Sequence, residues 1–390
     1  MRYDLVAAIL LFLTSATAVS AFGARVSDLA AAALFVLIAF AACRRSEAMF
    51  SPRTAMPAVL LIGTILFSTT LQLIFASESA RSDGASNAIA IPLGIAVAFL
   101  LLRRVRPEDQ LNVLAKYCYT VVFGCAALLA HQFYFGIPSW IQIIDDTNRF
   151  SALALNPNQL ALYLLPIPFF ALTLLSIGRL AALPAVALVA GAVAINFFAF
   201  GKALFSAWIV GFFVVGLFGL KRAWTLRRMM FWGAVLVVAY PLWHSYLLPV
   251  IEALYVGDAP GSVQGQGDAR VSLWTNGLIA WLDAPLMGHG PGHYSGLDRP
   301  YEGLEAHNFA IDWLTAYGIA GFAALLALVW SILSAVMSTR SWIVVGFYTC
   351  LAIQSMFHFY GRQPVFWIWC AVGLTMCGVL AQRKDTKCVV

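Results

Sequence analysis

The apolar run from Ala306 to Val336, AHNFAIDWLTAYGIAGFAALLALVWSILSAV, decides the fold class of this chain. The run exceeds the roughly 20 apolar residues that a helix needs to cross a bilayer. Its apolar residues are continuous and do not alternate with polar ones as they do in a barrel strand. Because hydrocarbon offers no partner to a backbone amide, a continuous run of this length predicts a membrane-spanning helix.

The rest of the chain repeats this pattern. Of its 390 residues 62% are hydrophobic and only 11% are charged, which excludes an ordinary soluble domain. We expect an all-α polytopic membrane protein, with residues 1–390 forming one integral membrane domain of about 12 transmembrane helices. The apolar runs lie near residues 5–22, 29–42, 58–75, 88–102, 111–130, 152–177, 180–199, 203–219, 229–249, 306–336, 341–359 and 364–381.

The basic residues predict the orientation of these helices. With both termini in the cytoplasm, the outer side holds only seven of the 24 basic residues: Arg25, Arg81, Arg149, Lys202, Arg270, Arg299 and Arg362. Such an excess of positive charge on the inner side is typical of multi-pass proteins. The net charge of +6 then reflects topology and attraction to anionic membrane lipids, so it predicts no nucleic-acid partner.

Two polar segments interrupt the apolar runs on the outer side. Residues 250–305 form a large loop between the ninth and tenth predicted helices, and residues 131–150 form a smaller, aromatic-rich loop that we expect to lie at the membrane interface. An inert membrane protein has no need of a long polar loop here. We therefore expect the functional site beside the large loop.

Several motifs are absent from the sequence. It has no P-loop and no dinucleotide-binding fingerprint, so energy must come from the substrate itself or from an ion gradient. The seven cysteines have no CxxC spacing, and His289 and His293 in a glycine-rich turn are a weak pattern for metal binding. We expect no cofactor and no metal.

Four basic residues are candidates for binding an anion. Arg149 stands just before Asn156-Pro157-Asn158, where either backbone donors and the arginine hold an anion or the arginine snorkels ahead of a proline-initiated helix. Lys202 occupies the outer turn before the eighth predicted helix. Arg270 begins a helix predicted to rest on the membrane surface, where pairing with Asp268 is the alternative, and Arg362 at the last outer turn is a weaker candidate.

His307 is the strongest candidate for proton transfer. It stands at the outer start of the run that ends at Val336, with Glu305 two residues before it and Asn308 beside it. Histidine titrates near neutral pH and can act as a general base towards a hydroxyl group. The alternative is an interfacial histidine that caps a helix.

These segments resemble the O-antigen ligase and Wzy-type polysaccharide polymerase superfamily of membrane glycosyltransferases. The resemblance covers the second half of the chain best, and it consists of motifs in a fixed order. These motifs are Arg149 to Asn158, Arg270-Val271-Ser272-Leu273-Trp274, Asp283 to Gly292, His307-Asn308 and Gly318-Ile319-Ala320-Gly321.

The resemblance implies a GT-C-like fold and a metal-independent, inverting transfer of a glycan from undecaprenyl diphosphate at the periplasmic face of the bacterial inner membrane. It places the family's roles on three residues: His307 activates the acceptor hydroxyl, and Arg149 and Arg270 bind the diphosphate. We expect His307 and Arg270 to be catalytic, and Lys202 and Arg362 to join in binding the diphosphate because of their positions on the outer side. The family commonly has a serine-arginine pair where this chain has Gly201-Lys202. Lysine keeps the charge there but loses the bidentate fork of arginine.

The acceptor stays open at this stage. A ligase transfers the glycan to a hydroxyl of lipid A core, whereas a Wzy-type polymerase extends another lipid-linked glycan. An anionic-solute transporter with an arginine-lined cavity and a structural scaffold of the cell envelope are the alternatives from other classes.

Overall fold

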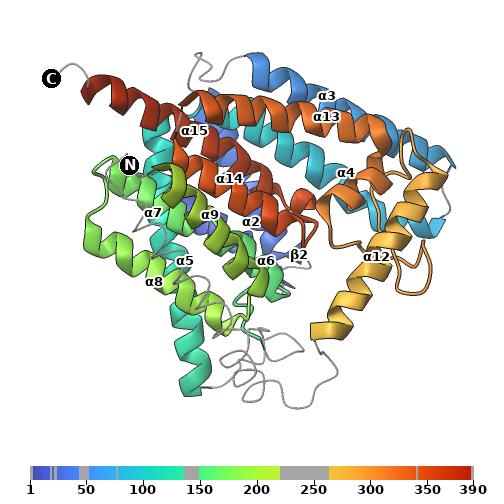
Figure 1. Cartoon of the computed structure of the whole chain (residues 1–390), viewed down its shortest axis with the longest axis horizontal. Coiled ribbons are helices and arrows are strands. Elements are labelled where there is room, and N and C mark those ends of the chain that lie inside the picture. Colours follow the sequence, from blue (N-terminus) through green and yellow to red (C-terminus); the bar gives the residue numbers. More distant parts are fainter. Residues whose placement is uncertain are drawn as a thin grey trace.

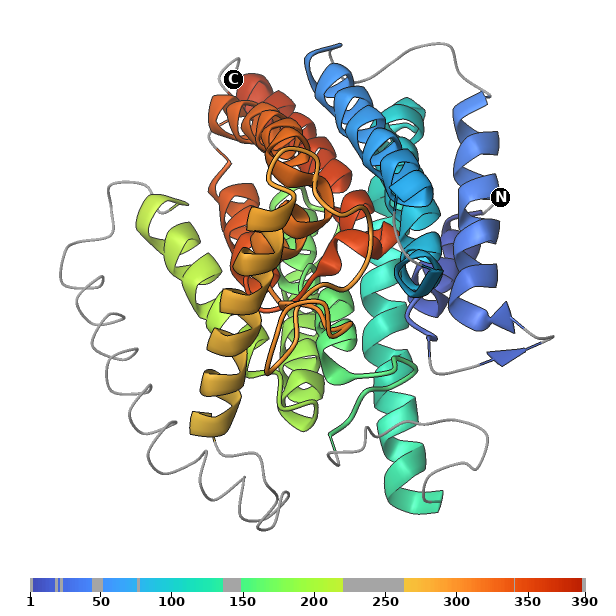
Figure 2. The ribbon, with the colours of Figure 1, turned by 90° about the vertical axis from the view of Figure 1, so that its right-hand side faces the viewer.

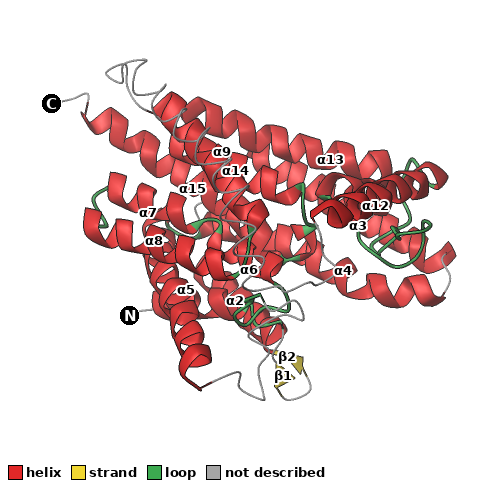
Figure 3. Cartoon of the chain, turned by 60° about the horizontal axis from the view of Figure 1, so that its bottom comes forward, coloured by secondary structure: helices red, strands yellow, loops and turns green. Residues whose placement is uncertain are grey.

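The computed structural model describes residues 3–17, 20–21, 24–43, 52–75, 78–135, 149–219, 263–339 and 341–387. Almost all of these residues are helical, and the only regular strands among them form a two-residue antiparallel ribbon between β1 and β2 (Figure 3). The predicted all-α class is therefore confirmed for the described part of the chain. The predicted span at residues 229–249 lies outside it, as do residues 136–148 of the predicted loop 131–150 and residues 250–262 of the predicted loop 250–305. Residues 131–135 belong to the helix Pro107–Phe135 and not to the predicted loop.

The helices are labelled as in Figure 1. Their bounds are α1 Tyr3–Leu13, α2 Val26–Cys43, α3 Pro52–Phe75, α4 Glu78–Ala96, η1 Val97–Leu101, η2 Leu102–Arg104, α5 Pro107–Phe135, α6 Pro157–Leu164, α7 Ile167–Ser176, α8 Ala182–Phe198, α9 Lys202–Gly219, α12 Val263–Asp283, α13 Phe309–Thr339, α14 Trp342–Ser355, η4 Tyr360–Arg362 and α15 Pro364–Lys387. The strands are β1 Ser20–Ala21 and β2 Ala24–Arg25.

Six stretches of helix among the described residues are long and apolar enough to cross a membrane, and several shorter apolar helices accompany them. The protein is thus a helical membrane protein, while the number of 12 spans stays a prediction. The stretch Pro157–Ser176 has 83% of its residues buried, against 28% for Val26–Cys43. The sixth predicted span therefore runs through the centre of the bundle, beside α15.

The central stretch is broken at Pro166, which separates α6 from α7. Proline has no N–H, so the carbonyl of Leu162 loses its partner within the helix. The indole N–H of Trp369 on α15 donates to this carbonyl at 3.2 Å. Tyr117 from α5 donates to the carbonyl of Tyr163 at 2.8 Å in the same break. The buried break is therefore satisfied by side chains of neighbouring helices, as hydrocarbon requires.

The long helix α13 is also broken, at Gly318, whose φ of 60° and ψ of −166° are open only to glycine. The loop that follows α12 fills the break with its own backbone. The N–H of His289 donates to the carbonyl of Thr315 at 2.9 Å, and the N–H of Ile319 donates to the carbonyl of Pro285 at 2.8 Å. Gly288 has a φ of 68° and packs so closely on Ala316 that a Cβ would collide with it.

These contacts attach the loop after α12 to α13. In Figure 2 the loop lies beside the ribbons of α12 and α13, which also pack directly on one another. The expected glycine-rich turn at residues 283–293 is confirmed, and so is a helix around Arg270, which is α12. His293 and Glu305, which belong to this loop, therefore lie close to the first turn of α13.

Candidate active site

The start of α13 holds His307 in a fixed backbone position. His307 has a φ of 52°, in the left-handed region that residues other than glycine seldom adopt. The carboxylate of Asp312 accepts hydrogen bonds from the backbone N–H groups on both sides of His307. These are the N–H of Ala306 at 2.7 Å and that of Asn308 at 3.1 Å. The side chain of Asn308 caps the helix by accepting the N–H of Ala310 at 3.0 Å. These hydrogen bonds therefore hold the backbone of His307, and with it the imidazole, in one position.

Glu305 lies at the centre of a buried cluster of ionisable side chains. Its carboxylate oxygen Oε1 lies 2.6 Å from Nη1 of Arg362 and 3.3 Å from Nε2 of His293. A backbone pair between Ser295 and Leu304 closes the intervening segment, and this closure brings His293 next to Glu305. Glu305 is only 6% exposed, so the structure buries a carboxylate together with its cation.

The electrostatic balance keeps Glu305 ionised. Burial alone would raise the pKa of its carboxyl group, but the close contact with His293 and the positive charge of Arg362 outweigh burial. The pKa of Glu305 is lowered to about 2. Glu305 is therefore a charged group at neutral pH and a weak base, suited to stabilising a nearby positive charge.

Two imidazole rings face this carboxylate. His307 Nδ1 lies 3.7 Å from Oε2 of Glu305, too far for a hydrogen bond, and its ring stacks on that of His358 with centroids 5.6 Å apart. Among the described residues, neither ring nitrogen of His358 has a hydrogen-bond partner, although this side chain is 3% exposed. His358 also packs against the ring of Tyr360 at 4.8 Å.

Both of these histidines are neutral at neutral pH. Burial lowers the pKa of His358 to about 3. Burial also lowers the pKa of His307; the charge of Glu305 opposes this shift, but the positive charges of Arg270 and Arg362 support it. A neutral imidazole keeps one nitrogen lone pair free to take a proton. His307 thus has the protonation state of a general base.

Arg270 reaches the same cluster from α12. It is half-buried, and its guanidinium carbon lies 5.3 Å from the centre of the Phe357 ring. Its charge acts on both His307 and His358. The structure therefore brings three of the residues selected from sequence, Arg270, His307 and Arg362, to one place.

Arg149 and Lys202 lie by the turn between α8 and α9. The N–H of Phe150 donates to the carbonyl of Phe198 at 3.1 Å, and Lys202 is the first residue of α9. Asn156 caps α6 and Pro157 takes its first position, so the motif begins a helix. Whether Arg149 binds an anion there or snorkels stays a prediction. A shared diphosphate site for Arg149, Lys202 and the cluster stays a prediction.

The Asn-Pro-Asn motif nevertheless contacts the cluster. The hydroxyl group of Tyr360 donates to the carbonyl of Asn158 at 2.8 Å and accepts from Gln354 at the same distance. Because the ring of Tyr360 packs on His358, the start of α6 supports the floor of the cluster. The motif around Pro157 therefore positions the site through its backbone.

One group of residues has the composition of a metal site. Among the described residues, Glu305, His307 and His358 each offer one ligand atom, and these atoms lie within 4.8 Å of one another. The guanidinium of Arg362 already neutralises Glu305 at 2.6 Å, and Arg270 adds a second positive charge nearby. These two cations disfavour a third at the same carboxylate.

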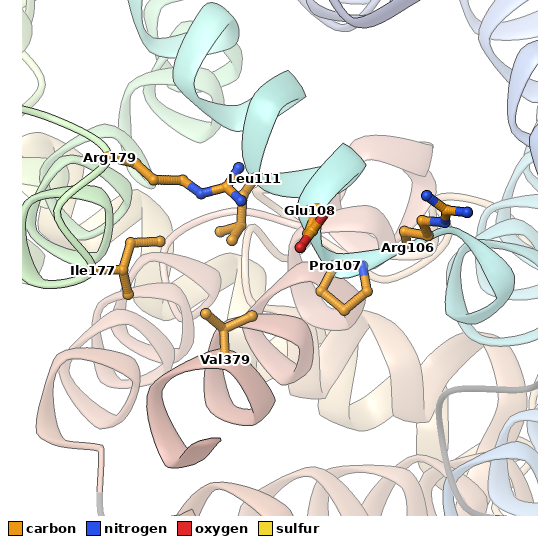
Figure 4. Close-up of a pocket in the computed structure, with 7 residues that line it drawn as sticks. All are labelled: Arg106, Pro107, Glu108, Leu111, Ile177, Arg179 and Val379. Carbon is orange, nitrogen blue, oxygen red and sulfur yellow. The ribbon is translucent and has the colours of Figure 1, made fainter. Parts of the chain in front are cut away.

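A separate cavity of about 510 Å³ lies elsewhere, lined by Arg106, Pro107, Glu108, Leu111, Ile177, Arg179 and Val379 (Figure 4). Along α15, Pro364 beside the cluster and Val379 in this cavity are about 22 Å apart, at about 1.5 Å per residue. Arg179 reaches toward α5 and donates to Asn112 at 2.9 Å. The cavity and the cluster thus lie at different ends of α15.

Sequence reasoning missed His358 and Asp312 and gave His293 little weight. His358 and Asp312 each lie inside a predicted apolar run, at residues 341–359 and 306–336 respectively. An ionisable residue inside such a run is expensive in a membrane and is by itself a signal of function. That signal was present in the sequence.

The fold and this cluster define a polytopic helical membrane protein with a buried site of histidine, carboxylate and guanidinium groups. Residues 152–326 match the family model described as O-antigen ligase. The match confirms the resemblance to the O-antigen ligase and Wzy-type superfamily, whose general activity is glycosyl transfer by ligases and polymerases. Arg270, Glu305 and His307 lie inside the matched segment, while His358 and Arg362 follow it. No curated protein matches the chain.

Proposed function

We propose that this protein transfers a glycan from undecaprenyl diphosphate to a hydroxyl group of lipid A core, at the periplasmic face of the bacterial inner membrane. The observation that carries the proposal is the neutral imidazole of His307, which lies beside Glu305 and is acted on by the charge of Arg270, within a segment that matches the O-antigen ligase family.

In this mechanism the reacting hydroxyl of the acceptor meets His307. Nδ1 faces Glu305 and the side chain is 44% exposed, so Nε2 is left for the acceptor. As the acceptor oxygen bonds to the anomeric carbon, its proton passes to His307. The bond from that carbon to the diphosphate oxygen breaks, and the diphosphate leaves with the electron pair. Glu305 stabilises the imidazolium that forms.

The leaving diphosphate needs positive charge. We propose that Arg270 contacts it directly and that Arg149 and Lys202 contribute from the turn between α8 and α9. Arg362 shares its charge with Glu305 at 2.6 Å, so its remaining donors supply a weaker contact. This division explains how one site holds a carboxylate and still attracts an anion. The residues need no metal for this chemistry, because guanidinium groups supply the electrostatic stabilisation.

The test is transfer by the purified protein in liposomes, with lipid-linked glycan as donor and lipid A core as acceptor. We expect the ligated product from the wild type, loss of product from His307→Ala, and full product from Glu108→Gln in the cavity at the other end of α15. Growth of glycan chains from lipid-linked donor alone would instead establish a Wzy-type polymerase. Uptake of an anionic solute that His307→Ala leaves unchanged, without any transfer, would establish a transporter.

A further inference from the structure

His358 is a buried histidine that the proposed reaction does not use. Its side chain is 3% exposed, and neither of its ring nitrogens has a hydrogen-bond partner among the described residues. Leaving a buried polar group without a partner destabilises a folded protein. A side chain in this state indicates a ligand group that completes its hydrogen bonds.

The geometry around His358 defines the size of that group. One atom each of Glu305, His307 and His358 lie within 4.8 Å of one another. Three points at such separations always have a position within about 2.8 Å of all three, which is the length of a hydrogen bond to a hydroxyl oxygen. A single oxygen atom at that position would contact all three side chains, once these side chains part to admit it.

The donors and acceptors around this position define its chemistry. A hydroxyl group has one proton to donate and two lone pairs that accept. The ionised carboxylate of Glu305 accepts one proton, and each neutral imidazole can present one N–H. A cation would instead meet the guanidinium groups of Arg362 and Arg270, which already act on Glu305 and on His307. The triad of Glu305, His307 and His358 thus matches a hydroxyl group.

We infer that this triad binds one non-reacting hydroxyl group of the sugar substrate, and that His358 is a specificity-determining residue for that hydroxyl. The inference rests on the proposed glycosyl transfer. Nδ1 of His307 points into the triad at Glu305, so Nε2 stays available to the reacting hydroxyl. A bound water molecule is the other source of the same chemistry.

The experiment compares acceptor sugars that each lack one hydroxyl group, using wild-type protein and His358→Phe. Phenylalanine keeps a ring against His307 and Tyr360 while removing both nitrogens. We expect one deoxy acceptor to raise the acceptor KM of the wild type by about tenfold, the effect of one lost hydrogen bond of about 1.4 kcal/mol. The same deoxy acceptor should change the KM of His358→Phe by less than about twofold, because both changes remove the same contact.

Two controls separate this role from a structural one. His131→Phe carries the same substitution on α5 and should respond to the deoxy acceptors as the wild type does. His358→Gln keeps an amide donor and should recover part of the selectivity, and it also serves if His358→Phe fails to fold.

Several results would overturn the inference. Equal sensitivity of wild type and His358→Phe to every deoxy acceptor would assign the position to water. A stoichiometric divalent cation that His358→Phe loses would assign it to a metal. In both cases the proposed transfer survives. Absence of transfer by the wild type would reject the proposed function itself, and the hydroxyl assignment with it.

Discussion

The two ends of α15 hold charge in different ways. At one end, Glu305 is buried against Arg362 and its pKa falls to about 2. At the other end, Arg106, Glu108 and Arg179 line the cavity of about 510 Å³ shown in Figure 4. The cavity offers space, but the cluster holds ionisable groups that shift the pKa of one another. Buried charges, and not volume, therefore favour the cluster as the candidate reactive site.

The largest expected difference between the cluster and the cavity is the loss of activity when His307 is replaced. His307→Ala should reduce the rate of glycan transfer by about 10²- to 10⁴-fold, because it removes the proposed general base. Its thermal unfolding temperature in detergent should change little, since the side chain is 44% exposed. Rates of single-turnover transfer measure the effect. A variant with the wild-type rate would remove His307 from the reaction.

The next effect concerns stability. Glu305→Gln removes the buried carboxylate and leaves Arg362 with an unpaired charge, so it should destabilise the protein by about 3–5 kcal/mol. Glu108→Gln, the matched change in the cavity at the other end, should cost less than about 0.5 kcal/mol. Thermal unfolding of both variants in the same detergent measures the contrast. Equal unfolding temperatures would mean that the two ends are energetically alike.

A smaller effect should appear in the binding of the donor. Arg270→Lys keeps the positive charge but loses the fork of donors that matches a phosphate group, so the donor KM should rise by about tenfold. The acceptor KM should stay near that of the wild type. Steady-state kinetics with each substrate varied in turn give both constants. A rise in the acceptor KM alone would place Arg270 at the acceptor.

Acidification should gradually lower the stability that the cluster gives to the folded protein. The pKa of His358 is lowered from 6.5 to about 3, and that of Glu305 from 4.5 to about 2. Between each pair of values the unfolded chain binds more protons than the folded one. Stability is then complete above about pH 6.5 and declines as the pH falls, first through His358 and below about pH 4.5 through Glu305 as well. Unfolding temperatures between pH 7 and 5 should fall less in His358→Phe than in the wild type. Identical slopes would contradict the neutral state of His358.

The smallest effect is expected in the cavity. Arg179→Ala removes the bond to Asn112, which is exposed, and such surface contacts are worth little. Transfer by this variant should stay within about twofold of the wild type, measured in the same liposome assay. A large loss of activity would show that the cavity end takes part in the reaction, and the contrast between the two ends would fail.

The sequence predicted the helical class, and it selected three residues that the structure brings together, because both depend on local composition. Apolar runs identified the helices, and His307 and Arg270 stood out as ionisable groups at the ends of such runs. The breaks were not predicted. The run 152–177 looked like one helix, yet Pro166 divides it and Trp369 satisfies the freed carbonyl of Leu162.

The contacts between side chains within the site could not be predicted from the sequence either. Glu305 was noted only as a neighbour of His307, because its ion pair with Arg362 joins residues 57 positions apart in the chain. The place of His358 depends on how the corner between α14 and η4 packs on α13. Such contacts arise from tertiary packing, and no local pattern in the sequence encodes them.

The break at Gly318 has a consequence for biosynthesis. The ribosome makes residues 284–290 before it makes the segment of α13 whose exposed carbonyls and amides pair with them. Until that segment emerges, the loop carbonyls and amides that pair with it must stay in contact with water. The hydrogen bonds between this loop and α13 can therefore form only after α13 has been made. Their formation is a late step in membrane insertion.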